Sequence, residues 1–342
     1  MQNPKRIGVW QTAFLGDAVL ILPLLRALSL RFPEAETHLF VRKGFEGLFA
    51  AQPGPASCTG FDKRGAQRSL AAAWRFGRAQ AARGFDVWIS AHQSARSAVV
   101  ARAVGARLRI GYSGQWFAPL AYTHRVDRRF HELHEVERLM RLGGPLGIPV
   151  DAPSASLTLP DDAHERARAV LAERAPGDGP LLGIHPGSTW PTKCWSEAGF
   201  VDVARQARQA GARVAVFGGP GEEPLAGRIA AASGAADCSG RFELPALAAA
   251  IGMLDAYLTN DSGPMHLAWV QDVPVVALFG PTVRGLGFAP RGPHSTVVET
   301  ALACRPCGLH GHKRCPEGHH RCMADITPAR VWAEVAAKLG LG

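Results

Sequence analysis

Short apolar runs alternate with longer amphipathic stretches in the first half of the chain, as strands alternate with helices in an α/β protein. The runs that predict strands are "RIGVWQ", "THLFV", "FDVWIS" and "LRIGYS". The segments that predict helices are residues 18–32, 68–82, 93–103 and 131–142. Pro23 falls early enough in the first helix to be tolerated there or to kink it. This order predicts a mostly parallel sheet covered by helices on both faces.

The alternation stops at residues 147–162, which are rich in Pro, Ser and Asp, and then starts again. This segment has the composition of a linker. Beyond it, the predicted strands are "LLGIHP", "ARVAVFGG", "AYLTN" and "PVVALFG", and the predicted helices cover residues 196–210, 222–232, 244–253 and a segment from 263 onward. A final helix is predicted after Thr327, which suits the N-cap, with Pro328 in its first turn.

Two doubly wound, Rossmann-like domains are therefore expected, over residues 1–155 and 165–326. A chain of 342 residues is long enough for two buried cores. Two such domains facing each other across one linker would enclose a cleft. Ligands of open α/β sheets bind beyond the carboxyl ends of the strands, so the side chains that follow each strand are the first candidates for a site.

Positive charge is concentrated in the first half of the chain. Residues 1–150 contain 21 Lys and Arg against 10 Asp and Glu, whereas residues 151–342 contain 17 against 19. This favours an anionic partner for the first domain, such as a phosphorylated molecule, an acidic membrane surface or nucleic acid, unless the proteome is simply arginine-rich. The basic candidates for contact with that partner are Lys63, Arg64, Arg96 and Arg129.

The chain shows neither a signal-peptide pattern nor a segment that could span a bilayer. Its first residues, "MQNPKRIGVW", lack a charged and then apolar leader, and "AVLILPLLRALSL" is too short and contains Arg26. We expect a cytoplasmic protein, held peripherally at the inner membrane if its partner lies there. Seven cysteines in such a compartment point to metal or redox chemistry before a disulfide framework.

Asp17 follows the first strand and has two readings, an N-cap of the next helix or a general base. After "LLGIHP", the hydroxyls of Ser188 and Thr189 and the charge of Lys193 could cradle a phosphate, although Lys193 could also be a solvated loop residue. Glu222 follows the next strand, where an acid commonly holds ribose hydroxyls or simply favours a helix N-terminus.

The segment "NDSGPMHLA" lies between the strand "AYLTN" and the next helix. Asp261 or Ser262 can cap that helix, Gly263 leaves its backbone N–H groups accessible, and His266 adds a donor one turn later. Thr282 follows the neighbouring strand. Consecutive strand ends thus supply partners for phosphate or ribose. No G-x-G-x-x-G motif is present, which counts against a nicotinamide dehydrogenase.

A cysteine- and histidine-rich segment precedes the final helix. Cys304, Cys307, Cys315 and Cys322 have the spacing C-x2-C-x7-C-x6-C, which matches no common zinc finger. Such density suits a structural zinc or iron site in a loop with little core of its own. A reduced loop or an oxidised cysteine pair is the alternative.

The motifs "HPGS…K.W", "NDSGPMHLA…VPVVALFGPT" and "C.PC…CPEGHH.CM.DITP" resemble the bacterial heptosyltransferases of glycosyltransferase family 9. More narrowly, they resemble the second heptosyltransferase of lipopolysaccharide inner-core assembly. The resemblance covers essentially the full chain. It implies a GT-B fold of two facing Rossmann-like domains, with residues 327–342 packing back toward the first. It also implies an ADP-heptose donor on the C-terminal domain and an anionic lipid A–Kdo acceptor on the N-terminal domain.

The resemblance also implies roles for single residues in an inverting transfer that needs no catalytic metal. Asp17 corresponds to the proposed catalytic base. Thr189 and Lys193 correspond to contacts with the donor phosphates, and Glu222 to a ribose ligand. The remaining matches to the donor signature are Asp261, Ser262, Gly263 and His266.

Two alternatives remain at this stage. A transferase of the same fold could use a protein acceptor, such as an autotransporter, in place of lipopolysaccharide. A metal-stapled nucleic-acid-binding protein would also have a basic half and a Cys/His tail, but no recognition-helix pattern follows that tail, so nucleic acid is not the expected partner.

Overall fold

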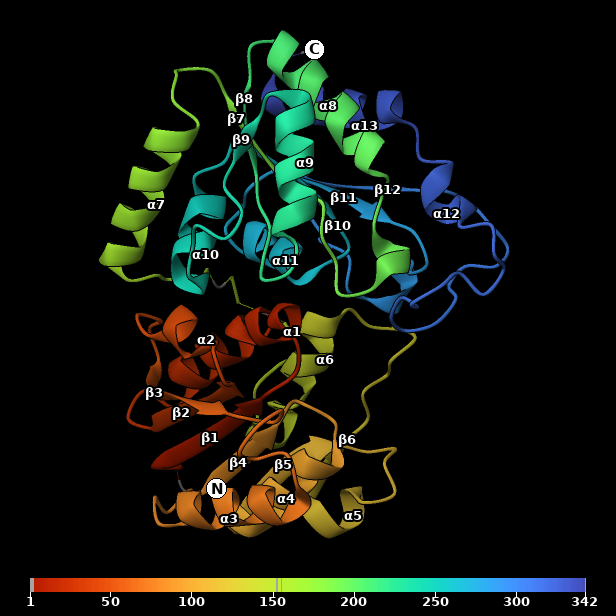
Figure 1. The fold of residues 1–342 in the computed structure, drawn as a ribbon. Helices are drawn as coiled ribbons and strands as arrows, with labels where there is room; N and C mark the ends of the chain where they lie inside the picture. The colour runs from red at the N-terminus through yellow and green to blue at the C-terminus, as the bar shows by residue number, and fades with distance from the viewer. Residues whose placement is uncertain (1–2, 152, 155, 342) are drawn as a thin grey trace. The chain divides into compact units, whose positions relative to one another are not determined.

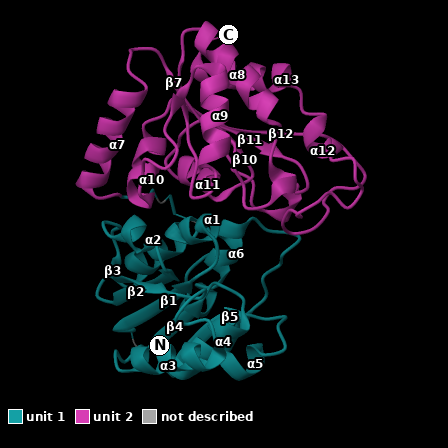
Figure 2. Cartoon of the chain, viewed as in Figure 1, with its two compact units in different colours: residues 1–158 teal, residues 159–342 magenta. Residues whose placement is uncertain are grey.

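The computed structural model describes residues 3–151, 153–154 and 156–341. The chain divides into two compact units, residues 1–158 and residues 159–342 (Figure 2). Each unit contains one six-stranded parallel sheet with helices on its faces (Figure 1). Sheets of this kind are buried on both sides, which explains the continuous apolar character of the central strands.

The sheet of unit 1 has the strand order β3-β2-β1-β4-β5-β6. Its strands are β1 (Arg6–Gln11), β2 (Glu36–Arg42), β3 (Pro55–Phe61), β4 (Val87–Ser90), β5 (Leu108–Tyr112) and β6 (His124–Val126). The helices are α1 (Leu15–Val19), α2 (Leu22–Arg31), α3 (Leu70–Ala81), α4 (Ala95–Val104), α5 (Ala118–Ala121) and α6 (Glu135–Arg141), with 3₁₀ turns η1 (Glu46–Phe49) and η2 (Gly144–Leu146).

Unit 1 matches the predicted alternation except for the short helix α5, which was not predicted, and for two further differences. The single helix expected over residues 18–32 is two helices, α1 and α2, and Pro23 lies in the first turn of α2. Strands β3 and β6 were not predicted. The first reads "PASCTGF" and is largely half-buried, and the second has three residues, so neither shows a clear apolar pattern.

An aromatic cluster fills the core of unit 1 on one face of the sheet. Trp10 packs edge-on against Phe61, with ring centroids 4.8 Å apart, and Trp88 lies 4.9 Å from Phe40. Both tryptophans are fully buried. These side chains come from the four adjacent strands β1 to β4, and they anchor the strand whose end leads to Asp17.

The sheet of unit 2 has the order β12-β11-β10-β7-β8-β9, which is the same winding as in unit 1. Its strands are β7 (Leu181–His185), β8 (Arg213–Val216), β9 (Ala236–Asp237), β10 (Ala256–Asn260), β11 (Val275–Phe279) and β12 (Ser295–Glu299). The helices are α7 (Asp161–Arg174), α8 (Glu197–Gln209), α9 (Glu223–Ser233), α10 (Leu244–Gly252), α11 (Gly263–Trp269), α12 (Arg321–Ala324) and α13 (Pro328–Leu339), with 3₁₀ turns η3 (Pro191–Lys193) and η4 (Arg284–Leu286). Every predicted strand of this half is present.

Helix α7 begins within the segment that was expected to be a linker. Pro160 occupies its N-cap, and Asp161 and Asp162 lie in its first turn. Its buried stripe contains only Ala163, Ala167 and Leu171. So few apolar positions give a weak periodic signal, which explains why the sequence did not predict the helix.

The final helix, α13, begins as predicted, because the Thr327 hydroxyl accepts a hydrogen bond from Arg330 N and Pro328 is the first helical residue. Its packing toward the N-terminal domain stays a prediction, and its apolar face packs within unit 2. Val331 and Val335 are fully buried in the core of unit 2, and α13 packs against α8. Among the described residues, no helix is long and apolar enough to cross a membrane.

Candidate functional site

Three polar side chains meet at the carboxyl ends of β10 and β11 in unit 2. The Lys193 ammonium lies 2.5 Å from Asp261 Oδ2, and the Thr282 hydroxyl donates to the same oxygen at 2.6 Å. All three residues are buried. Lys193 ends η3, Asp261 follows β10, and Thr282 follows β11. The structure therefore brings together three of the residues predicted from different strand ends.

This cluster gives Asp261 a structural role that the sequence left open. A carboxylate beside a diphosphate is repulsive unless a cation or donors compensate it. Here Asp261 is compensated on one oxygen by Lys193 and Thr282, and so it orients the ammonium. Asp261 does not cap α11, whose N-cap position is Ser262, and the Ser262 hydroxyl lies 3.2 Å from the Thr259 hydroxyl.

Glu222 follows β8 after a short loop, at the N-cap position of α9, and pairs with a buried histidine. Its Oε2 is 2.8 Å from His185 Nε2 and accepts a hydrogen bond from Gly219 N at 2.9 Å. Burial raises the pKa of Glu222, but His185 and the Gly219 N–H lower it more, so the net direction is downward. A Cβ on Gly187 would lie 2.1 Å from the Glu222 carboxyl, so the loop after β7 passes directly over it.

The other predicted donor residues surround this edge of the sheet. Thr189 is exposed, and Ser188 is partly exposed, with its hydroxyl 3.5 Å from Trp190 N. Gly263 begins α11. His266 lies one turn later, is buried, and contacts Trp269 edge-on.

Sequence reasoning assigned no role to Asn260, which ties two of these loops together. Its Oδ1 accepts a hydrogen bond from Trp195 N at 3.1 Å, and its Nδ2 donates to Pro186 O at 2.7 Å. The side chain is fully buried. The signal in the sequence was an amide at the end of an otherwise apolar strand, where a buried polar group must find partners.

In unit 1, Asp17 is the third residue of α1. The interpretation of Asp17 as the N-cap of this helix is therefore wrong. Phe14 occupies the N-cap, and its N–H donates to Asp17 Oδ2 at 3.2 Å. Burial raises the pKa of Asp17 to about 6, and the charge of Glu135 adds to this, while Phe14 N–H, Arg128 and Lys63 oppose it. A carboxyl with a pKa near neutrality can accept a proton during a reaction, which an ordinary capping aspartate does poorly.

A buried charge network beside Asp17 was not predicted. Arg128 Nη2 donates to both carboxylate oxygens of Glu135, at 2.8 and 2.7 Å, and Arg138 Nη1 donates to the same group at 3.0 Å. The side chains of Glu135 and Arg138 are almost completely buried. Periodicity gave no sign of it, because α6 has charged residues on its buried face.

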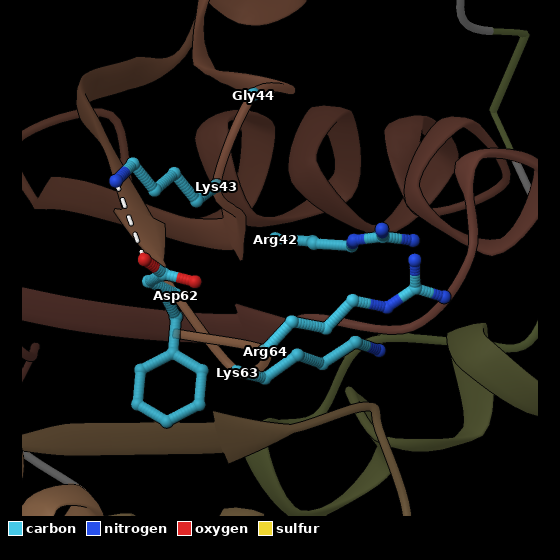
Figure 3. Close-up of a pocket in the computed structure, with 7 residues that line it drawn as sticks. Arg42, Lys43, Gly44, Asp62, Lys63 and Arg64 are labelled. Carbon is cyan, nitrogen blue, oxygen red and sulfur yellow. Dashed lines mark hydrogen bonds and ion pairs between the residues drawn. The ribbon is translucent and has the colours of Figure 1, made fainter. Parts of the chain in front are cut away.

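A basic pocket of about 350 Å³ lies at the carboxyl ends of β2 and β3. Its lining is Arg42, Lys43, Gly44, Phe61, Asp62, Lys63 and Arg64. Figure 3 shows the side chains of Arg42, Lys63 and Arg64 extending toward the same side, whereas Lys43 turns the other way to pair with Asp62 at 3.3 Å. Burial lowers the pKa of Arg42, and the neighbouring Arg64 charge adds to this, as expected where cations lie close together.

The predicted basic residues divide into those at this pocket and one that pairs elsewhere. Lys63 and Arg64 line it, and Arg96 donates to Lys63 O at 2.9 Å. Burial lowers the pKa of Lys63 to about 8, helped by the neighbouring arginines, and its ammonium donates to Thr12 O at 2.5 Å. Arg129 is exposed and forms an ion pair with Glu132. Arg42 and Lys43 are the basic residues of the pocket that were not predicted from the sequence.

The structural metal site expected at the cysteine-rich segment is not supported. Among the described residues, no group of three or more His, Cys, Asp or Glu side chains is arranged to hold a metal ion. Burial raises the pKa of Cys307 and of Cys322, and the charges of the neighbouring cysteines add to this. Cys307 Sγ instead donates to Cys304 O at 3.3 Å.

Comparison with known sequences identifies relatives over the whole chain. The model of "Glycosyltransferase family 9 (heptosyltransferase)" matches residues 73–319. Lipopolysaccharide heptosyltransferase 2 of Escherichia coli K12 is 26% identical over 98% of both chains. Lipooligosaccharide heptosyltransferase 2 of Campylobacter jejuni is 32% identical over 45% of this chain, a match that spans about half of that relative.

Comparison with solved structures supports the predicted architecture. A family 9 glycosyl transferase from Veillonella parvula has a TM-score of 0.89 at 24% identity, covering 99% of this chain and 98% of the other. ADP-heptose LPS heptosyltransferase II of E. coli has a TM-score of 0.79 at 23% identity, covering 98% of each. Together with the two sheets of identical winding, these matches confirm the predicted GT-B fold class.

Proposed function

Since the chain belongs to glycosyltransferase family 9, we propose that it transfers a heptose from ADP-heptose to an anionic acceptor, the lipid A–Kdo inner core of lipopolysaccharide. The observation that carries this proposal is the buried cluster of Lys193, Asp261 and Thr282. The named functions of the relatives support the sugar and the acceptor. The match to the family model and the named functions of the relatives favour a transferase over the nucleic-acid alternative.

We propose that the donor binds at the carboxyl end of the sheet in unit 2. Lys193 would contact the diphosphate, and Ser188 and Thr189 would add hydroxyl donors from the loop before it. Glu222, held by His185 and with a lowered pKa, would accept hydrogen bonds from the ribose hydroxyls. Gly263, His266 and Thr282 lie at the neighbouring strand ends, so they are the remaining candidates for contact with the sugar nucleotide.

The proposed reaction is an inverting displacement with Asp17 as the general base. The Asp17 carboxylate takes the proton of an acceptor hydroxyl, whose oxygen attacks the anomeric carbon opposite the diphosphate. The bond from that carbon to the diphosphate oxygen breaks, and ADP leaves with the electron pair. Lys193 stabilises the negative charge that develops on the leaving group.

The acceptor is proposed to bind unit 1 through its phosphates and carboxylates. Arg42, Lys63 and Arg64 present three cations to one pocket, and arginine forks suit planar or tetrahedral oxyanions. An acceptor in a lipid surface would also attract the basic unit peripherally to the cytoplasmic face of the inner membrane. Arg129 has the weakest support, because it already pairs with Glu132.

Calorimetric titration with ADP, UDP and GDP tests the donor assignment. ADP is expected to bind with a dissociation constant in the micromolar range, about −8 kcal/mol, and more tightly than the other two. A preference for UDP or GDP would keep the fold and overturn the heptose donor. Incubation of the enzyme and ADP-heptose with lipid A–Kdo or with an autotransporter protein then separates the two acceptor classes.

The pH dependence of kcat/KM should be bell-shaped. Asp17 must be unprotonated, so the rate should rise with pH through about 6, and Lys63 must be protonated to hold an anion, so it should fall above about 8. Rates measured from about pH 5 to about pH 9 at constant ionic strength check this. Lys63→Met should lose the upper limb and keep the lower one. A flat profile below neutrality would contradict the role of Asp17.

The double variant Arg42→Ala, Arg64→Ala should raise KM for lipid A–Kdo about tenfold and leave ADP affinity unchanged, because charge-assisted contacts to the acceptor are lost. The effect should shrink at high salt, since exposed charges are screened. The control is the double variant Arg75→Ala, Arg78→Ala, which removes two exposed arginines of α3. It changes the net charge of the protein by the same amount, but away from the pocket. Equal effects of the two pairs would indicate general charge attraction and no acceptor pocket.

A further inference from the structure

The cysteine-rich segment, residues 304–322, hydrogen-bonds directly to the loop that carries Lys193. The Thr192 hydroxyl donates to His312 O at 2.9 Å and accepts from His312 N at 2.7 Å. His320 Nε2 lies 2.8 Å from Thr192 O. The residue before Lys193 is thus held by the segment on both its side chain and its backbone.

The same segment is anchored to the strand end that carries Thr282. Arg305 donates to Thr282 O at 2.8 Å, to Phe279 O at 3.1 Å and to the Glu299 carboxylate at 2.8 Å. Cys307 N donates to Pro281 O at 3.0 Å. Buried carbonyl groups at a strand end need such donors, and here the segment supplies them. The segment therefore holds in place the two loops that carry Lys193 and Thr282, the residues whose side chains contact Asp261.

One turn of the segment packs directly over Lys193. A Cβ on Gly311 would lie 2.6 Å from Trp190 Cβ and 3.0 Å from Lys193 Cγ, so only glycine permits this approach. The ring of the preceding residue, His310, is parallel to that of Trp190, with centroids 6.2 Å apart. His310 is exposed, and its stacking on Trp190 keeps it beside the loop that carries Lys193. Burial and the charge of Lys193 lower the pKa of His310, whereas the charge of Asp261 opposes this.

We propose that residues 304–322 form one wall of the donor site, in which Gly311 lets the segment position Lys193 and His310 donates a hydrogen bond to the donor diphosphate. This inference rests on the proposed function. It gives the cysteine-rich segment a role that needs no metal. The anchors formed by Thr192 and Arg305 hold the wall in place, and His310 is the side chain that touches the ligand.

Two matched pairs of variants test this by titration with ADP and with adenosine. Gly311→Ala should weaken ADP binding about tenfold, whereas Gly308→Ala should not, since a Cβ there meets nothing closer than 3.6 Å. His310→Ala should weaken ADP about fivefold without changing adenosine affinity, and His310→Gln should restore part of the loss. His319→Ala is the control, because the ring of this histidine accepts a hydrogen bond from Arg321 N, within the segment.

The outcomes separate this inference from the proposed function. Wild-type protein that binds no ADP would overturn both. Wild-type binding with unchanged affinity in Gly311→Ala and His310→Ala would overturn the wall alone and leave the transferase standing. A loss in His310→Ala that is equal for ADP and adenosine would place the histidine away from the diphosphate, and so would also contradict the proposal. Thermal unfolding of each variant identifies any loss caused by misfolding.

Discussion

Replacing Asp17 by Asn should lower kcat about a thousandfold while leaving ADP affinity unchanged. A general base contributes about a hundred- to ten-thousandfold to a rate, and asparagine keeps the shape but cannot accept the proton. ADP affinity should persist because the donor is proposed to bind unit 2. The measurement is single-turnover transfer from ADP-heptose to lipid A–Kdo, with a parallel ADP titration.

The matched control is Asp127→Asn, which changes an exposed carboxylate of the same unit. Asp127 accepts a hydrogen bond from Arg129 N and is not part of the buried network beside Asp17. Its variant should keep wild-type kcat. If Asp17→Asn lost less than about tenfold, another base would have to take the proton, because so small a change is below the range of general-base catalysis.

The architecture was predictable because it depends on patterns that act locally. Each central strand is a short apolar run, and each is followed by an amphipathic helix, so alternation alone predicted two wound sheets. The edge strands β3 and β9 were not predicted, because a half-buried or very short strand needs few apolar residues and so shows no clear pattern. Helix α7 was not predicted because its buried face consists of only three apolar residues, which give too weak a helical pattern.

The site was predictable only as far as strand ends place residues together. Lys193, Asp261 and Thr282 were each expected at a strand end, and the parallel sheet brings them into contact. The partners of Asp17 could not be predicted in this way. Glu135 and Arg128 reach it from the region after β6, a separation that no periodicity encodes. The metal site predicted for the cysteine-rich segment rested on composition alone. Composition does not say whether the folded chain brings the cysteine side chains into the geometry that a metal needs.

Replacing Lys193 by Met should weaken ADP binding about a hundredfold, the largest effect expected for any donor-site substitution. A hydrogen bond to a charged group contributes about 1.5–3 kcal/mol, and the ammonium is the cation of the buried cluster. The loss should be greater for ADP than for adenosine, because the contact is to the diphosphate. The matched control is Lys338→Met, which replaces a partly exposed lysine of α13 that donates to Pro293 O, and it should bind ADP as the wild type does.

Among the described residues, this variant leaves the buried Asp261 carboxylate with the Thr282 hydroxyl as its side-chain partner and no cation, which can destabilise the fold by about 3–5 kcal/mol. Adding Asp261→Asn removes the uncompensated charge and should restore the unfolding temperature. Because the ammonium is still missing, ADP affinity should stay low in that double variant. Recovery of both stability and ADP binding would mean that Lys193 only neutralises Asp261, and the diphosphate would then need another cation.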